Sequence, residues 1–269
     1  MSRLKISAIS YLNTAPLLWD FEHGSGGAGF DLSYTIPSAC AQALREGTAD
    51  IGIIPAAAYA SIPDLIIIPD VAIAARREVR SILLVSKVPV ERIRTVALDT
   101  SSMTSVALTK ILFEKWHGGP RQYVPAAPDL DSMLANCDAA LLIGDPALQV
   151  DRTRYVTLDL AEEWVARTGK SFVFAFWAIR RAALAGRDGG GIAEAFQTSR
   201  DHGLSPKNLE IIVQEWSGRL NLPAATVRDY LTQNIHYYLD APCLEGLMHF
   251  YRCAAEIGAL PQTPELRFL

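Results

Sequence analysis

Polar side chains that could bind a small anion occur in four short segments beside apolar stretches of strand length. Two of them are residues 10–14 (SYLNT) and residues 100–105 (TSSMTS), and the second leads into an expected helix. The others are Gly144 with Asp145, and Ser81. Ligands of open α/β sheets bind beyond the carboxyl ends of strands, and backbone N–H groups at a helix start favour an anion. Residues 100–105 are therefore a candidate carboxylate site, although Ser and Thr would equally serve there as helix caps.

Other spacings that would indicate a nucleotide, a cofactor or a metal are incomplete. Residues 24–29 (GSGGAG) have the glycine spacing of a dinucleotide-binding turn, but an expected helix precedes them and an expected strand follows. This is the reverse of the order that such a turn requires, so we expect a flexible loop. Residues 47–52 (GTADIG) lack the Lys-Ser/Thr ending of a phosphate-binding loop, and the five histidines have no metal-ligand spacing. The sequence therefore predicts neither a metal nor an organic cofactor.

The composition is typical of a folded protein that binds neither nucleic acid nor a membrane. Of the 269 residues 50% are hydrophobic and 20% are charged, with a net charge of −4. A basic surface for nucleic acid is not expected, and no apolar run reaches the roughly 18 residues that span a bilayer. The first residues do not follow the pattern of an export signal. The cysteines form no CxxC pair, so we expect a cytoplasmic protein whose cysteines are buried thiols.

Apolar segments of strand length alternate with segments of helix length, which is typical of α/β folds with parallel strands. Strands are expected at residues 4–9, 32–36, 50–54, 65–68, 81–85, 95–98, 123–124, 139–143, 155–158 and 171–179. Among the helices, one begins at Pro16, and a second is capped by Ser38 and ended by Gly47. From about residue 181 only helices are expected, so the chain is predicted to end in a helical segment.

Six sequence blocks, in order, resemble the chorismate dehydratases of the futalosine route to menaquinone. They are SYLNTAPL (10–17), DIGIIP (50–55), RSILLVSK (80–87), VALDTSSMTSVALTKIL (96–112), LLIGDPAL (141–148) and LAEEWVARTGKSFVFAFW (160–177). Several blocks in register over nearly the whole chain are far more specific than any single motif. The resemblance implies a two-lobed type II periplasmic-binding-protein fold, of the α/β class, with a cleft between the lobes. One lobe is expected to comprise residues 1–88 and 179–269, and the other residues 89–178.

The reaction that the resemblance implies is the elimination of water from chorismate, a small dicarboxylate, to give 3-[(1-carboxyvinyl)oxy]benzoate without a cofactor. The sibling enzyme of that route, 1,4-dihydroxy-6-naphthoate synthase, shares the fold but begins with a different motif in place of SYLN. The alternative from another class is a non-catalytic binding protein for a small carboxylate, because a fold does not determine a function.

The resemblance and the positions of the polar segments together indicate the site residues. We expect Asn13, Ser81 and Asp145 to take part in catalysis, with the Asn13 amide bonding to the ring or its leaving hydroxyl. Substrate contacts are expected from Ser10, Tyr11, Pro55, Thr100, Ser101, Thr104, Ser105 and Gly144. The proton is removed either by the substrate's own side-chain carboxylate or by Asp145. Asn13 and Asp145 also have structural alternatives, since each stands where it could cap a helix.

Residue 103 departs from the family pattern. Many relatives carry Arg at the corresponding position of a TSSRTS turn, whereas this chain has Met103. If that arginine contacts substrate in relatives, the contact is lost here or supplied elsewhere, and we assign Met103 no role.

Overall fold

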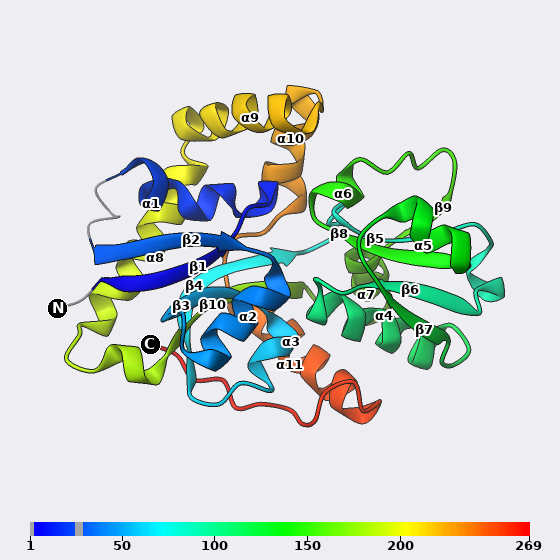
Figure 1. Cartoon of the computed structure of the whole chain (residues 1–269), viewed down its shortest axis with the longest axis horizontal. Helices are drawn as coiled ribbons and strands as arrows, with labels where there is room; N and C mark the ends of the chain where they lie inside the picture. The colour runs from blue at the N-terminus through cyan, green and yellow to red at the C-terminus, as the bar shows by residue number, and fades with distance from the viewer. Residues whose placement is uncertain (1–2, 25–28) are drawn as a thin grey trace.

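Two five-stranded sheets lie side by side in the computed structural model, which describes residues 3–24 and 29–269 (Figure 1). The first sheet has the order β2-β1-β3-β10-β4 and the second the order β7-β6-β8-β5-β9. The strands of the first are β1 (Leu4–Ile9), β2 (Phe30–Thr35), β3 (Ile51–Pro55), β4 (Leu65–Ala75) and β10 (Phe172–Arg180). Those of the second are β5 (Ile82–Ser86), β6 (Thr95–Asp99), β7 (Gln122–Ala126), β8 (Ala139–Ile143) and β9 (Val156–Asp159). Most of the glycine-rich loop expected at 24–29 lies outside the described residues.

Helices connect most of the strands and make up most of the chain after β10, whereas residues 235–240 and 257–269 are extended or turn segments. Up to β10 they are η1 (Leu12–Leu18), α1 (Trp19–His23), α2 (Pro37–Glu46), α3 (Ala56–Tyr59), η3 (Val90–Arg92), α4 (Met103–Trp116), α5 (Leu130–Asn136), α6 (Asp145–Leu148) and α7 (Leu160–Thr168). After β10 follow η4 (Arg181–Leu184), α8 (Gly189–Leu204), α9 (Pro206–Leu220), α10 (Ala224–Asp229), the π-helical turn η5 (Tyr230–Asn234) and α11 (Ala241–Glu256). The helical C-terminal segment expected from the sequence is confirmed.

One strand in each sheet runs against its neighbours. β10 is antiparallel to β3 and β4, and β5 is antiparallel to β8 and β9, whereas the other pairs are parallel. Uniform parallel pairing, expected from the alternation of elements, is therefore wrong for these two strands. Each follows a crossover from the other sheet, so it starts at the cleft where its neighbours end.

The crossovers divide the chain at positions other than those predicted. β5 pairs within the second sheet, although a boundary at residue 88 assigned it to the first lobe. β10 pairs within the first sheet, although residues up to 178 were assigned to the second lobe. The chain therefore crosses between the sheets at residues 76–81 and 169–171. Both strands are apolar along nearly their whole length, so their residue pattern does not reveal which sheet supplies their hydrogen bonds.

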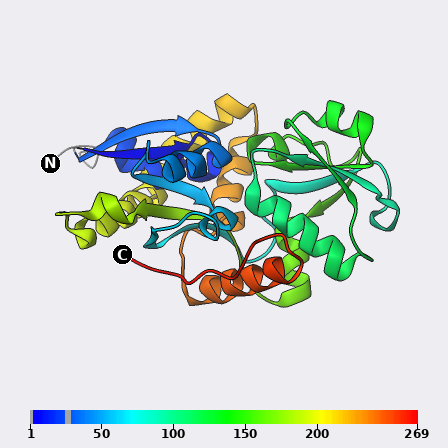
Figure 2. The same cartoon turned by 60° about the horizontal axis from the view of Figure 1, so that its bottom comes forward.

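The C-terminal helices bind the two lobes together as well as covering the first. α8 packs on η1, α1 and β4, whereas α11 packs on both β10 and α4, which belong to different lobes. Figure 2 shows α11, in orange and red, along the junction below both sheets. One apolar cluster accordingly extends through both lobes, from Ile6 in β1 to Leu141 in β8. Burial of such a shared cluster stabilises the contact between the lobes.

Local sequence signals were most accurate where a strand is buried or a glycine ends a helix. β1 and β8 occupy the predicted residues, and Gly47 ends α2 with a φ of 75°. The cap predicted at Ser38 is wrong, because α2 begins one residue earlier at Pro37 and its N-cap Ile36 makes no side-chain hydrogen bond. Proline has no N–H to satisfy at a helix start, so the side-chain cap is dispensable.

The thiols are placed as predicted, and no helix within residues 3–24 and 29–269 is long and apolar enough to cross a membrane. All four cysteines, Cys40, Cys137, Cys243 and Cys253, are free and buried. Burial raises the pKa of the Cys40 thiol to about 12, so this cysteine is a poor nucleophile.

Candidate active site

A cavity lies where the lobes meet, at the carboxyl ends of β1, β3 and β8 and the first residues of β5. The space between protein atoms is about 510 Å³, and this value includes open solvent at the mouth of the cavity. Its apolar wall comes from Ile9, Ile53, Ile73, Ile82, Ile143 and Phe174, and its polar groups from Tyr11, Asn13, Thr14, Ser102, Thr104 and Ser105. No charged side chain is among the described residues that line it. The cavity therefore suits a flat apolar ring with a few polar substituents.

Asn13 reaches the cavity because the chain after β1 turns sharply into the 3-10 helix η1. Pro16 lies inside this short helix, where its missing N–H is tolerated better than in a longer α-helix. Thr14 secures the turn, with its hydroxyl 2.7 Å from the Tyr11 carbonyl oxygen. Asn13 is inside η1, whose N-cap is Tyr11. The structural alternative of Asn13 as a helix cap is therefore wrong, and its amide faces the cavity.

In the turn before α4, some of the serine side chains form hydrogen bonds within the turn itself. Ser101 donates its N–H and its hydroxyl to Asp99 Oδ1, at 2.8 and 2.6 Å. Ser102 is the N-cap of α4 and accepts the Ser105 N–H at 3.2 Å. The capping alternative for this turn is therefore correct for Ser102. The Ser102 and Ser105 hydroxyl protons stay available at the cavity, whereas the Ser105 N–H is committed to Ser102.

Thr104 joins the lobes instead of offering a hydroxyl to a ligand. Its Oγ1 donates to the Phe174 carbonyl at 3.0 Å and accepts the Ala57 N–H at 3.1 Å. Ala57 and Phe174 belong to the first lobe and Thr104 to the second. A single hydroxyl proton makes one strong hydrogen bond, so Thr104 lines the cavity with its donor already committed.

Asp145 and Gly144 close the cavity from the second lobe. The Leu12 N–H donates to Asp145 Oδ1 at 3.0 Å, across the cleft. Burial raises the pKa of Asp145 to about 6, while the Leu12 N–H and the charge of Arg219 act in the opposite direction. Its carboxylate bonds across the cleft to Leu12, and Gly144 is the N-cap of α6. The structural alternative, in which Asp145 caps α6, is therefore wrong.

A close approach explains why residue 144 is glycine. Its φ is +66°, and a Cβ atom there would lie 2.7 Å from the Tyr11 ring. Side chains rarely adopt this backbone conformation, and the ring leaves no room for one. Gly144 also donates its N–H to the Ser81 carbonyl at 2.7 Å. The glycine thus permits the contact between the lobes at Tyr11.

Ser81 is fully buried behind the cavity wall, at the end of the first crossover. The Asp159 carboxylate accepts the N–H groups of Val79 and Arg80, at 3.1 and 2.6 Å, and Arg80 has the left-handed φ of 62°. The Tyr230 hydroxyl donates to Ser81 Oγ at 2.7 Å. Several contacts therefore fix a backbone conformation that a non-glycine residue rarely adopts.

The structure brings six of the predicted site residues together at the cavity, namely Tyr11, Asn13, Pro55, Thr104, Ser105 and Gly144. Ser10 is exposed and does not line the cavity; it accepts a 3.4 Å hydrogen bond from Arg219, beside which it lines a separate pocket. Thr100 is exposed and lines a groove on the other side of the turn, together with Met103. Position 103 therefore points away from the cavity in this chain, and neither residue contacts the space where a ligand fits.

Two polar residues that line the cavity, Thr14 and Ser102, were not predicted from the sequence. Asp99 and Tyr230, which bond to the predicted residues Ser101 and Ser81, were also missed. Asp99 is fully buried, its Oδ2 has no hydrogen-bond partner, and burial raises its pKa. An acidic residue at the end of an apolar strand was the available signal for Asp99. Ser102 lay within the predicted turn but was not singled out. Tyr230 had no signal, because the π-helical turn that buries it has no distinctive residue pattern.

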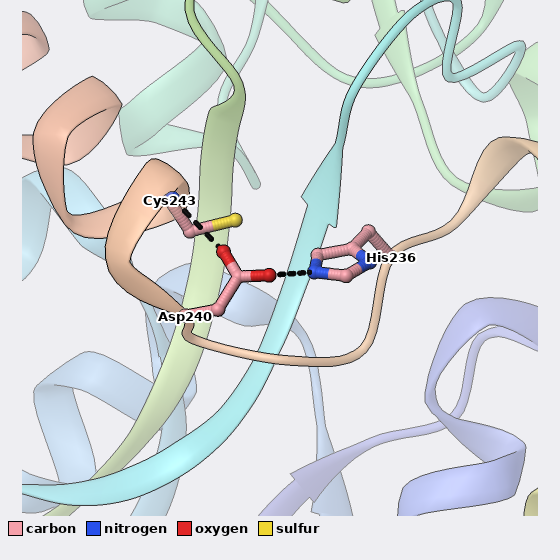
Figure 3. A group of neighbouring side chains, drawn as sticks. All are labelled: His236, Asp240 and Cys243. Carbon is pink, nitrogen blue, oxygen red and sulfur yellow. Dashed lines mark hydrogen bonds and ion pairs between the residues drawn. The ribbon is translucent and has the colours of Figure 1, made fainter.

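His236, Asp240 and Cys243 form a cluster with metal-ligating atoms, all within 4.8 Å of one another (Figure 3). Asp240 is already engaged, since its carboxylate lies 2.8 Å from His236 Nε2 and 2.5 Å from an Arg76 nitrogen. It also caps α11 by accepting the Cys243 N–H at 3.1 Å. Burial raises the pKa of the Cys243 thiol to about 12. Through Asp240, these contacts attach the start of α11 to Arg76, which directly follows β4.

Comparison with known proteins gives a consistent result over nearly the whole chain. The sequence model of a menaquinone biosynthesis family matches residues 4–256. A relative from Thermus thermophilus, named chorismate dehydratase, is 30% identical over 272 residues, which covers 94% of each chain.

Solved structures of much lower sequence identity share the fold. A protein from Archaeoglobus fulgidus has a TM-score of 0.73 at 14% identity, covering 96% of this chain and 98% of its own. The periplasmic aliphatic sulphonate binding protein SsuA from Escherichia coli has a TM-score of 0.67 at 15% identity, covering 100% of this chain and 94% of its own. The periplasmic-binding-protein-like fold expected from the sequence is therefore confirmed.

Proposed function

The chain belongs to the menaquinone biosynthesis family, and from this membership we propose that it is a chorismate dehydratase. It is thus an enzyme of the hydro-lyase class, which removes water from chorismate to give 3-[(1-carboxyvinyl)oxy]benzoate. The observation that carries the proposal is the position of Asn13, which lines the cavity between its apolar wall and the start of α4. The cytoplasmic location expected from the sequence stays a prediction.

The cavity offers separate places for the ring and for a carboxylate of chorismate. The isoleucine side chains and Phe174 provide an apolar surface for the cyclohexadiene ring. The hydroxyl groups of Ser102 and Ser105 at the start of α4 hold one carboxylate, and the partial positive charge of the helix start favours an anion there. These two serines replace Thr100, Ser101 and Thr104 in that role, since the structure exposes the first and commits the hydroxyl protons of the other two.

The reaction breaks two bonds on neighbouring ring carbons. The proton leaves the carbon that bears the enolpyruvyl ether, which the ring carboxylate activates through the conjugated double bond. The electron pair expels the neighbouring hydroxyl group, and the proton and hydroxide together form the released water. Because the ring becomes aromatic, the overall step is strongly downhill. The protein must therefore orient the substrate and stabilise an enolate-like charge.

Asn13 and Ser81 are the protein groups that assist this elimination. The Asn13 amide both donates and accepts hydrogen bonds, so it can hold the leaving hydroxyl and keep the reacting carbon in place. Ser81 lies buried behind Ile82 and Gly144, which belong to the cavity wall, and we assign its hydroxyl a hydrogen bond toward the same end of the cavity. Desolvation by the closed lobes strengthens both interactions.

The substrate's enolpyruvyl carboxylate serves as the base. This carboxylate is joined to the carbon that loses its proton through the vinyl carbon and the ether oxygen, so its effective concentration at that proton is high. Asp145, the alternative base, lies outside the cavity wall and has Oδ1 bonded to the Leu12 N–H. Its contribution is to close the cleft, by joining the two lobes across it.

A chromatographic assay separates this function from its rivals. The purified protein is treated with a chelator, incubated with chorismate and analysed for the enolpyruvyl benzoate. Formation of that product without added cofactor supports the dehydratase. Chorismate that is bound, as shown by thermal shift, but recovered intact supports a binding protein. Intact chorismate without binding leaves the sibling synthase reaction as the next assay.

A further inference from the structure

The C-terminal segment holds the first crossover at three points. Residues 76–81 carry the chain from the first lobe to the second, and residues 230–240 lie against them. The contacts are Asp240 Oδ2 with the Arg76 guanidinium at 2.5 Å, Asn234 Nδ2 with the Glu78 carbonyl at 3.2 Å, and the Tyr230 hydroxyl with Ser81 Oγ at 2.7 Å. The last contact reaches a residue of the proposed site, whereas the first joins two side chains and the second holds the crossover backbone at Glu78.

The Tyr230 hydroxyl determines where Ser81 can direct its own proton. Tyr230 is 1% exposed, and its hydroxyl donates to Ser81 Oγ. A serine hydroxyl that accepts at one lone pair keeps one proton to donate in another direction. Burial raises the pKa of Tyr230, and hydrogen bonding with Ser81 and with Asn13 acts in the opposite direction. The tyrosine therefore stays protonated at neutral pH and lies between the two proposed catalytic side chains.

A π-helical turn places Tyr230 at this position. The Ile235 N–H donates to the Tyr230 carbonyl at 3.2 Å, which closes the wider turn of η5. The turn directs both Tyr230 and Asn234 toward the crossover, where each finds its partner. Wide turns of this kind occur often at functional sites.

We infer that Tyr230 is a positioning residue for the elimination, which acts by fixing the direction of the Ser81 hydroxyl beside Asn13. The inference rests on the proposed dehydratase function and extends it to a residue outside the cavity wall. The tyrosine does not contact substrate, so its loss is expected to lower the rate of the chemical step and to leave substrate affinity nearly unchanged.

Tyr237 provides a matched control within the same segment. It is also a buried tyrosine, 3% exposed, but its hydroxyl has no hydrogen-bond partner. Tyr237→Phe therefore removes the same atom from a neighbouring buried ring without touching Ser81. Any general effect of losing a buried phenol oxygen appears in both variants.

The test compares kcat and KM for chorismate among Tyr230→Phe, Tyr237→Phe, Ser81→Ala and the Tyr230→Phe/Ser81→Ala double variant. We expect Tyr230→Phe to lower kcat roughly 10-fold to 100-fold, with KM changed less than about threefold, since misplacement of a reacting group costs rates of this order. Tyr237→Phe should retain the parent rate. In the Ser81→Ala background, Tyr230→Phe should have almost no further effect, because coupled residues are not additive.

The outcomes separate this inference from the proposed function. Parent-like kcat in Tyr230→Phe, or an equal loss in the presence and absence of the Ser81 hydroxyl, overturns the positioning role while the dehydratase stands. No turnover by the unaltered protein overturns both. Should Tyr230→Phe unfold, Asn234→Ala loosens the same crossover at Glu78 and should lower kcat in the same direction; an unchanged kcat there overturns the inference as well.

Discussion

Two turns follow corresponding strands of the two sheets, yet they use their polar side chains differently. After β1, residues 10–14 bend into η1 and present the Asn13 amide to the cavity. After β6, two hydroxyl groups of residues 100–105 are already engaged: Ser101 donates to the Asp99 carboxylate and Thr104 to the Phe174 carbonyl oxygen. A hydroxyl-rich turn is therefore not the same as a turn with free hydroxyl groups. The first turn is suited to chemistry, and the second mainly to holding the lobes and one carboxylate.

The largest effect is expected from the first turn. Asn13→Ala should lower kcat about 1,000-fold, because an amide aimed at the reacting groups stabilises charge that develops in the transition state. Steady-state assays with chorismate measure the loss, and thermal unfolding checks the fold. Asn136→Ala, at the exposed end of α5, is the control and should retain the parent rate. A folded Asn13→Ala protein with unchanged turnover removes Asn13 from the site.

Contact between the first turn and the second lobe should matter next. Gly144→Ala places a Cβ 2.7 Å from the Tyr11 ring, so the lobes cannot close fully and kcat/KM should fall about 100-fold. Gly186→Ala is the control, since Gly186 has a similar φ of +70° with no neighbour in reach and lies outside both crossovers. Small-angle scattering should give a larger radius of gyration for Gly144→Ala than for the control variant. Equal activities of the two variants would contradict the role of Gly144 in closure of the lobes.

A smaller effect is expected in the second turn. Ser105→Ala removes one of the two free hydroxyl groups at the start of α4 and should raise KM about 10-fold, the size expected for a hydrogen bond to a charged group. Its kcat should change less than about threefold, because a contact made equally to substrate and transition state affects binding and not the chemical step. Thr100→Ala, on the other side of the turn, should change neither constant. If Thr100→Ala weakens binding as much as Ser105→Ala, the assignment of the two hydroxyl groups is wrong.

The smallest effect on turnover is expected at Asp145. Asp145→Asn can still accept the Leu12 N–H, so kcat should stay within about threefold if the substrate supplies the base. A large loss of kcat with unchanged binding would instead make Asp145 the base.

Asp145 should also leave a signature in the pH dependence of stability. Its carboxyl pKa is raised from 3.8 to about 6, so the folded protein holds a proton that the unfolded chain has released. Its contribution to stability is therefore present below pH 3.8 and is lost as the pH rises through about 6. Melting temperatures of the parent and of Asp145→Asn should separate over this window, with the parent falling. Parallel curves would show that the carboxyl is not desolvated.

The sequence allowed the fold and part of the site to be predicted, for reasons visible in particular elements. β1 and β8 are short buried strands flanked by turn residues, and that local pattern determined their bounds. β5 and β10 were also recognised as strands, but which sheet they join depends on hydrogen-bond partners far away in the chain. Their apolar side chains fit either sheet equally well, so the lobe boundaries were misplaced.

The polar site was harder to predict because hydrogen bonding decides which groups are free. Asn13 and Gly144 belong to turns that follow strands, and such positions are recognisable in a sequence. The commitment of Thr104 to Phe174 joins residues 70 positions apart, and that of Tyr230 to Ser81 joins residues 149 positions apart. Neither pair leaves a signal in the local sequence. The Thr104 hydroxyl was therefore wrongly predicted to be free for substrate, and Tyr230 was not predicted at all.

The most direct test of the account is a proton NMR time course of chorismate with the chelator-treated protein. The account predicts that the ring signals of chorismate give way to those of a meta-substituted aromatic ring while both enolpyruvyl methylene protons remain. Loss of the enolpyruvyl signals, or a chorismate spectrum unchanged by folded protein, would contradict the elimination of water at this cleft.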